Sequence, residues 1–281
     1  MKSIFKLLLF LACLSNLYAQ FEPPKVSPHA TVSQTFGFTT ITIDYHRPSV
    51  HERKIWGGLV PYGKIWRTGA NDATTIQFST DVKIVGNKIP AGIYSVFTIP
   101  EENEWTIILN DQVKISGLDH NPEHDIYRFK AKPAQSRFVE QLQFSIAEAT
   151  DTYSQVYLNW ENLQITFKVE NDLQNEAYLK IKEAIAAKPQ DPAVYNDCVK
   201  YAADKGFFLT EAIQWADKSI LYGGGYIAYY HKARVLLGLK KFDDALRAID
   251  TCRNKGRNEK DYDSFVSLLD LLERQIKSVM K

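Results

Sequence analysis

The sequence predicts a β + α chain of two domains, in which an antiparallel β-sandwich-like domain precedes an all-α helical array. Between residues 31 and 169 apolar residues alternate with polar ones, which is the period of half-buried strands. From residue 171 onward they recur at the helical period, and 281 residues suffice for two domains. The expected parts are a signal peptide (1–19), an extended linker (20–30), the β-sandwich-like domain (31–170) and the helical domain (171–281).

The first segment has the features of a secretory signal peptide. Lys2 and Lys6 give it a positive start, residues 7–14 form a short apolar run, and cleavage is expected after Ala19. The run is too short to cross a bilayer, so we expect an exported, periplasmic or extracellular protein without a transmembrane segment. Lipoprotein anchoring at Cys13 stays open as an alternative.

Charge and cysteine content exclude two classes of protein. Removal of the signal peptide leaves 32 basic against 33 acidic residues, a balance that argues against a nucleic-acid partner. Only Cys198 and Cys252 remain, which is too few for a disulfide framework. Both lie in helical patterns beside apolar residues, so buried free thiols are expected, and a single bridge stays open.

Many short strand-like segments without intervening helices predict an antiparallel sandwich or barrel. Turn signals such as Gly86-Asn87 and Pro90-Ala91-Gly92 separate them. The segments with the clearest alternation are 41–45, 82–85, 94–99, 105–109, 137–144, 156–160 and 163–169.

The helical half contains a short internal sequence repeat, which we call the internal echo. Residues 211–217 match residues 244–250 at an offset of 33 residues, which brings Ala212 onto Ala245. This period resembles that of tetratricopeptide repeats, in which small residues let paired helices approach closely. The resemblance implies a degenerate two-unit array with a capping helix, and a groove for a protein partner. An unrelated helical bundle remains the alternative.

Three polar-aromatic strings in the β half stand out from ordinary strand and turn sequence. They are Asp44-Tyr45-His46-Arg47-Pro48-Ser49, Arg53-Lys54-Ile55-Trp56-Gly57 and Trp66-Arg67-Thr68-Gly69-Ala70-Asn71. Over roughly residues 27–169 the chain resembles the exported bacterial family of the domain of unknown function 2911. The resemblance implies a β-sandwich-like fold and a tetratricopeptide-like tail, and it implies no reaction because the family has no established activity.

The chain departs from the family pattern at two places. His46 stands where a Ser is usual, and Ile115-Ser116-Gly117 lacks the Trp that usually precedes the Gly. A role that depends on either position is therefore in doubt for this chain.

The strings predict a pocket for a glycan or another small polar ligand. Guanidinium groups suit carboxylates, phosphates and sugar hydroxyls, and aromatic faces suit sugar rings. Alternatively, Arg67 and Asn71 hold a long loop by bonding to backbone carbonyls. The candidate ligand-binding residues are Tyr45, His46, Arg47, Trp66, Arg67, Thr68 and Asn71.

No catalytic residue, metal ligand or cofactor is assigned from the sequence. His120 and His124 are separated by Pro122, which predicts a loop rather than one metal-binding helix face. The expected function is a non-catalytic binding module with a partner-docking helical tail. The alternatives are a hydrolase that uses His46 with Asp44, and a structural adaptor that acts through the tail alone.

Overall fold

The computed structural model describes residues 23–113 and 119–280. The expected signal peptide, the anchoring alternative at Cys13 and the departure at residues 115–117 lie outside the described residues. The chain divides into two compact units, Met1–Asn171 and Asp172–Lys281, next to the boundary at residue 170 expected from the sequence. Among the described residues, no helix has the length and apolar character needed to cross a membrane.

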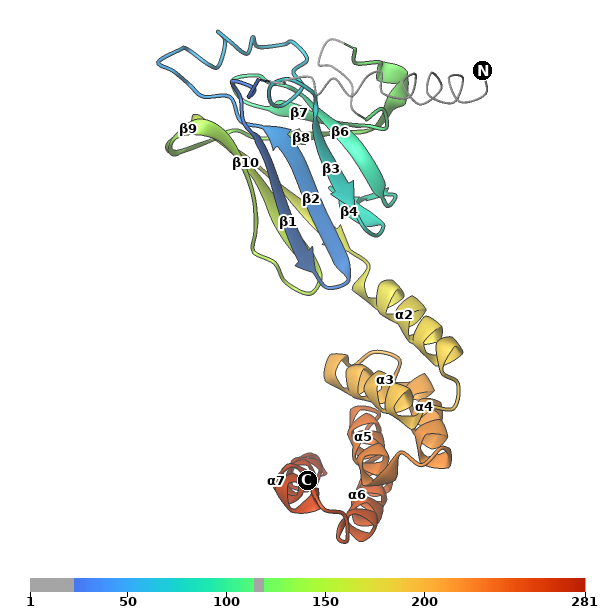
Figure 1. Ribbon diagram of the computed structural model, residues 1–281. Helices are drawn as coiled ribbons and strands as arrows, with labels where there is room; N and C mark the ends of the chain where they lie inside the picture. The colour runs from blue at the N-terminus through green and yellow to red at the C-terminus, as the bar shows by residue number, and fades with distance from the viewer. Residues whose placement is uncertain (1–22, 114–118, 281) are drawn as a thin grey trace, which may run out of the picture. The chain divides into compact units, whose positions relative to one another are not determined.

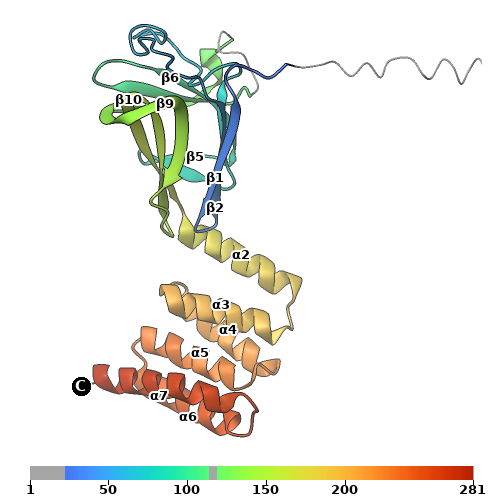
Figure 2. The same ribbon diagram turned by 60° about the vertical axis from the view of Figure 1, so that its left-hand side comes forward.

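The first unit is built from two antiparallel sheets, as the alternation of apolar residues predicts (Figures 1 and 2). In the described part of the chain one sheet has the order β1-β2-β3-β6-β7-β8 and the other the order β5-β4-β10-β9. The bounds are β1 His29–Phe36, β2 Thr39–His46, β3 Thr74–Phe78, β4 Val82–Ile84, β5 Asn87–Ile89, β6 Gly92–Ile99, β7 Trp105–Asn110, β8 Asp125–Ala131, β9 Ala134–Ala147 and β10 Tyr153–Asn171, with a short 3-10 helix η1 at Pro122–His124.

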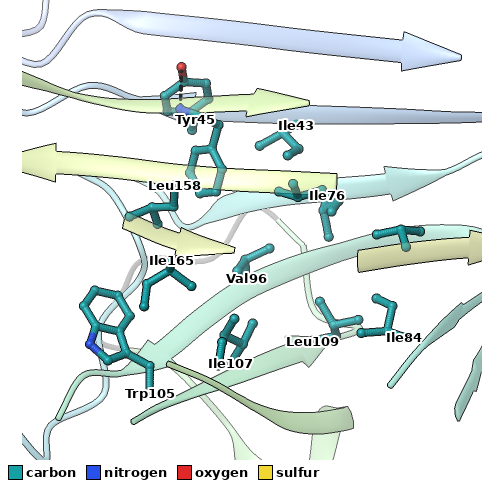
Figure 3. Packing of buried hydrophobic residues seen from close by; sticks show 14 of the residues in the cluster. Ile43, Tyr45, Ile76, Ile84, Val96, Trp105, Ile107, Leu109, Leu158 and Ile165 are labelled. Atoms are coloured by element: carbon teal, nitrogen blue, oxygen red, sulfur yellow. Dashed lines mark hydrogen bonds between the residues drawn. The ribbon is translucent and has the colours of Figure 1, made fainter. Parts of the chain in front are cut away.

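The core lies between the two sheets because each strand buries every second residue. On β2, Ile43 and Tyr45 are buried, whereas Asp44 lies exposed on the opposite face. The Tyr45 hydroxyl accepts a hydrogen bond from the backbone N–H of Phe144 on β9, at 3.1 Å (Figure 3). Leu158 of β10 packs in the same cluster, so side chains of both sheets fill one apolar layer.

The second unit contains six α-helices in the described part of the chain. Asp172 and Asp191 cap the first two by accepting bonds from backbone N–H groups, and Gly206 ends the second in the left-handed conformation. The bounds are α2 Leu173–Ala187, α3 Pro192–Lys205, α4 Leu209–Leu221, α5 Gly225–Gly238, α6 Phe242–Gly256 and α7 Tyr262–Val279.

Small residues lie where these helices pack. Ala212 on α4, Ala233 on α5 and Ala245 on α6 are completely buried, in agreement with the internal echo of the sequence. Cys198 and Cys252 are free and buried, and burial raises the pKa of each thiol to about 11. They are therefore packing residues and not reactive thiolates at neutral pH.

Candidate functional site

The polar-aromatic strings fall mainly in one long loop, residues 47–73, which connects β2 to β3 at one end of the sandwich (Figure 1). The loop is held by backbone bonds to three parts of the β unit. The N–H of Arg47 donates to Pro28 at 2.9 Å, and the N–H of Val50 donates to Glu140 on β9 at 2.8 Å. Trp66 exchanges two backbone bonds with Thr98 on β6, at 2.7 and 2.8 Å. The loop is thus an ordered part of the scaffold.

Two tryptophans of this loop and two of the strands pack together. Trp66 stacks on Trp160 of β10, with ring centroids 5.9 Å apart, and Trp56 meets Trp105 of β7 edge-on at 4.9 Å. Among the described residues, the buried indole N–H groups of Trp56, Trp105 and Trp160 have no hydrogen-bond acceptor. The contacts of Trp56 with Trp105 and Trp160 are edge-to-face, the arrangement that aromatic rings prefer.

A cavity of about 310 Å³ is enclosed mainly by residues of the loop, with the ring of Trp160 as its wall on the side of β10, and we call it the loop pocket. Its wall combines apolar side chains with donors, and it includes no Asp or Glu. The lining residues are Val26, Ser27, Pro48, Ser49, His51, Arg53, Leu59, Val60, Trp66, Arg67, Gly69, Ala70 and Trp160.

Arg67 brings a buried donor without a partner to the wall. Its Nε is buried and has no partner, and within residues 23–113 and 119–280 its guanidinium makes neither a hydrogen bond nor an ion pair. Only its backbone carbonyl is engaged, accepting from the N–H of Thr74 at 3.1 Å. A buried donor without a partner is costly, so it requires an explanation such as an absent ligand.

Arg53 contributes the second positive charge of the wall. It closes a turn in which two consecutive residues, His51 and Glu52, have left-handed φ values of 47° and 56°. Its Nε donates to the carbonyl of Val50 at 3.0 Å, and its Nη2 donates to that of Ser49 at 2.5 Å. Such backbone conformations are costly for residues other than glycine and cluster at functional sites.

Three of the residues expected at the site have structural contacts instead. The Nε of Arg47 donates to the carbonyl of Leu142 at 3.0 Å, which ties the start of the loop to β9. Thr68 is completely buried, and its hydroxyl donates to Trp66 O and to Thr98 Oγ1, both at 3.3 Å. Asn71 has a left-handed φ of 60° and a long bond of 3.4 Å to the carbonyl of Ser27.

The glycine of the Trp-Arg-Thr-Gly string, Gly69, lies where there is little room for a side chain. A Cβ at this position would lie 3.0 Å from Thr74 Oγ1 and 3.3 Å from the carbonyl oxygen of His46. The absence of a side chain therefore lets the loop lie directly against the end of β2, beside the wall of the loop pocket.

The other two expected residues border a second cavity, of about 560 Å³, on the outer face of the six-stranded sheet. We call it the sheet-face pocket. His46 lines it with Tyr45, although the ring of Tyr45 belongs to the core. Burial lowers the pKa of His46, and the charges of Lys25 and His29 lower it further.

The charged groups of the sheet-face pocket bond to one another. Asp44 Oδ1 lies 2.8 Å from His29 Nε2, and its Oδ2 accepts from Thr31 at 2.9 Å. The Nζ of Lys25 lies 3.9 Å from Oδ2 of Asp72. Asp44 and His46 do share one face, but Asp44 is bonded to His29, which weakens the hydrolase alternative.

The histidines after β7 each lie within hydrogen-bond distance of a different carboxylate. Buried Asp125 accepts from Asn110 at 2.8 Å, from His120 at 2.9 Å and from Arg128 at 2.9 Å. His124 bonds instead to Asp111 at 2.7 Å. Across the described residues, no group of three or more His, Cys, Asp or Glu side chains is placed to hold a metal ion.

Sequence reasoning thus reached part of the loop pocket and missed the rest. Of the seven expected residues, Trp66 and Arg67 line it. It missed His51, Arg53 and Leu59, although Arg53 opens one of the quoted strings and the concentration of Trp in the β half was visible. Trp160 lies more than ninety positions after Trp66 (160 against 66), so no local pattern connects the two.

A family model described as "Protein of unknown function (DUF2911)" matches residues 27–169. The chain belongs to the DUF2911 family. The match lies in the β unit of this DUF2911 protein, includes every lining residue of the two pockets except Lys25 and Val26, and leaves the helical unit outside. No curated protein and no solved structure matches the chain.

Proposed function

We propose that the protein is an exported, non-catalytic binding module whose β unit holds a small polar ligand, such as an envelope glycan, in the loop pocket. The observation that carries the proposal is the guanidinium of Arg67, which borders the cavity and has no partner among the described residues. A buried donor that makes no hydrogen bond costs about 1–3 kcal/mol of stability. A ligand that supplies an acceptor would remove this cost.

The composition of the wall supports a ligand with both a polar and an apolar side. Trp66 and the half-exposed Leu59 supply apolar surface, and Ser49 supplies a hydroxyl. The volume of about 310 Å³ is at the lower end of the range of about 300–1,000 Å³ typical of small-molecule sites. One sugar ring or a molecule of similar size is therefore the appropriate scale.

Export rests on the sequence of the first nineteen residues. The positive start, the short apolar run and the small residue before the expected cut are those of a cleaved signal peptide. The ligand would then be met outside the cytoplasm, where cell-envelope glycans are abundant.

The helical unit would dock a protein partner. Its support is a cavity of about 410 Å³ between α4, α5 and α6, whose wall includes Ile213, Tyr229 and Leu236. A Tyr229→Ala variant of the full chain is expected to lose a partner that the wild type retains from an envelope extract. Equal recovery by both forms would count against this role.

The ligand-binding proposal can be tested with a defined panel of neutral and acidic monosaccharides and amino acids. Binding to the mature full chain is measured by calorimetry and by the fluorescence of the tryptophan cluster. We expect at least one compound to bind the wild type and to bind the Arg67→Met variant at least tenfold more weakly. If no compound binds, or if the variant binds as well as the wild type, the loop pocket is not the site.

A further inference from the structure

The loop pocket differs from the sheet-face pocket in the sign of its charges. Arg53 and Arg67 both line it, and none of its lining residues is acidic. In the sheet-face pocket, by contrast, Lys25 and His29 are matched by Asp72 and Asp44. Glu140 is not among the lining residues, but one of its carboxylate oxygens accepts from the backbone N–H of His51, which lines the pocket, at 3.0 Å. A ligand with a negative charge would supply the counter-charge that the lining residues lack.

We infer that the ligand of the loop pocket is a small organic carboxylate, whose carboxylate is held by Arg67 with the charge of Arg53 and whose body packs on Trp66 and Leu59. This inference rests on the proposed function and specifies its ligand class. A guanidinium fork binds a carboxylate through two parallel N–H···O bonds, which is stronger and more selective than one bond to a hydroxyl.

The two arginines have different roles in this arrangement. Arg53 already donates to the carbonyls of Ser49 and Val50, so its position is fixed and it adds mainly charge. Arg67 has its donors free and supplies the hydrogen bonds. Because the guanidinium of Arg53 is already held, an anion would bind beside it with little further loss of side-chain entropy.

The apolar part of the wall argues against a bare inorganic anion. Leu59, Val60 and Pro48 lie in the same wall as the two guanidinium groups, and the ring of Trp160 borders it from β10. A simple anion would leave this apolar surface exposed to water, whereas an acidic sugar or an aliphatic acid would cover it. Both sources share a carboxylate on an apolar or saturated body.

The test compares matched pairs of compounds that differ only in charge. Glucuronate is paired with methyl glucoside, and hexanoate with hexanol, and each is titrated into the mature full chain by calorimetry. We expect at least one carboxylate to bind at least tenfold more tightly than its neutral partner. The pair that shows this difference distinguishes an acidic sugar from an aliphatic acid.

Two variants separate specific recognition from general attraction. Arg67→Met is expected to remove the preference for the carboxylate, whereas Arg137→Met, the same change at an exposed position of β9, is expected to retain it. Equal binding of a carboxylate and its neutral partner would overturn the inference and leave the proposed function standing. Binding of none of the four compounds, together with failure of the wider panel, would overturn both.

Discussion

Trp66, in the loop between β2 and β3, stacks on Trp160 in the middle of β10, with ring centroids 5.9 Å apart and ring planes inclined by only 18°. The contact joins a loop of the six-stranded sheet to a strand of the other sheet. Both rings line the loop pocket. The core of the sandwich therefore continues directly into the wall of the candidate site.

Trp160→Ala should be among the most destabilising substitutions in the β unit. Trp160 is 1% exposed, so truncation creates a cavity in the tryptophan cluster, and the expected loss of unfolding free energy is about 3–5 kcal/mol. Urea unfolding followed by the fluorescence of the remaining tryptophans measures it. Phe138→Ala on β9, at a side chain that is 55% exposed, is the control and should change stability by less than about 0.5 kcal/mol. Equal effects would mean that the cluster is not part of the core.

Gly69→Ala should destabilise the loop through one crowded contact. The added methyl group would meet Thr74 Oγ1 at 3.0 Å, and the expected cost is about 1–3 kcal/mol. In a Thr74→Ala background the cost should fall, because the crowded oxygen is gone. A double-mutant cycle based on unfolding free energies measures this coupling, and strictly additive effects would contradict the close approach.

Asp125→Asn should lower the free energy of unfolding and make it depend less on pH in the acidic range. Burial alone would raise the pKa of Asp125, but the bonds from Asn110, Arg128 and His120 outweigh it and hold that pKa below its ordinary value of 3.8. The ionised form therefore stabilises the folded state above the unfolded pKa, and this contribution is lost as pH falls through the folded pKa.

At pH 7 the expected cost of Asp125→Asn is about 3–5 kcal/mol, because Arg128 and His120 lose a buried charged partner. Urea unfolding at pH 7 and at pH 3 measures both the loss of stability at pH 7 and the change of stability with pH. Asp111→Asn, at a surface pair with His124, is the control, with an expected loss of about 0–1 kcal/mol. A steeper acid loss in Asp125→Asn than in the wild type would refute the assignment.

His231 should make the helical unit sensitive to mild acid. Burial on α5, followed by the charges of Arg234 and Lys200, lowers its pKa from 6.5 to about 4, although Asp204 acts in the opposite direction. Between these two values the unfolded chain binds a proton that the folded chain does not, so stability falls as pH decreases from 6.5 toward 4. The expected loss between pH 7.5 and pH 5 is about 2 kcal/mol.

Helical circular dichroism during urea unfolding at these two pH values measures that loss. His231→Phe removes the titrating group and should be nearly insensitive to pH over the same range. A variant that loses as much stability as the wild type would place the pH dependence elsewhere.

Much of the fold follows from periodicity, which is a local property of the sequence. Burial at Ile41, Ile43 and Tyr45 follows the alternation on β2, and the echo between Ala212 and Ala245 marks two helices that bury a small residue. The β-sandwich followed by helices was therefore predictable. The start of β1 at His29, inside the expected linker, was not, because His29 and Ala30 are not strongly apolar and the exact ends of a strand are poorly marked in a sequence.

The site was less predictable because it depends on contacts between distant segments. Residue type alone identified Arg47 and Arg67 as equivalent candidates, yet the guanidinium of Arg47 bonds to a carbonyl of β9 and that of Arg67 has no partner among the described residues. Which guanidinium finds a backbone acceptor depends on where β9 passes the loop. Similarly, Trp160 lies at the pocket only because the two sheets pack against each other.

The unfolding free energy of Arg67→Met, compared with that of Arg47→Met, tests the central claim most directly. Because the guanidinium of Arg67 has no partner in the described structure, its replacement by an apolar chain of similar length should leave stability unchanged or raise it. Arg47→Met should lower stability by about 1–2 kcal/mol, since its bond to Leu142 is lost. A loss for Arg67→Met that equals or exceeds that for Arg47→Met would show that Arg67 serves the scaffold rather than a ligand.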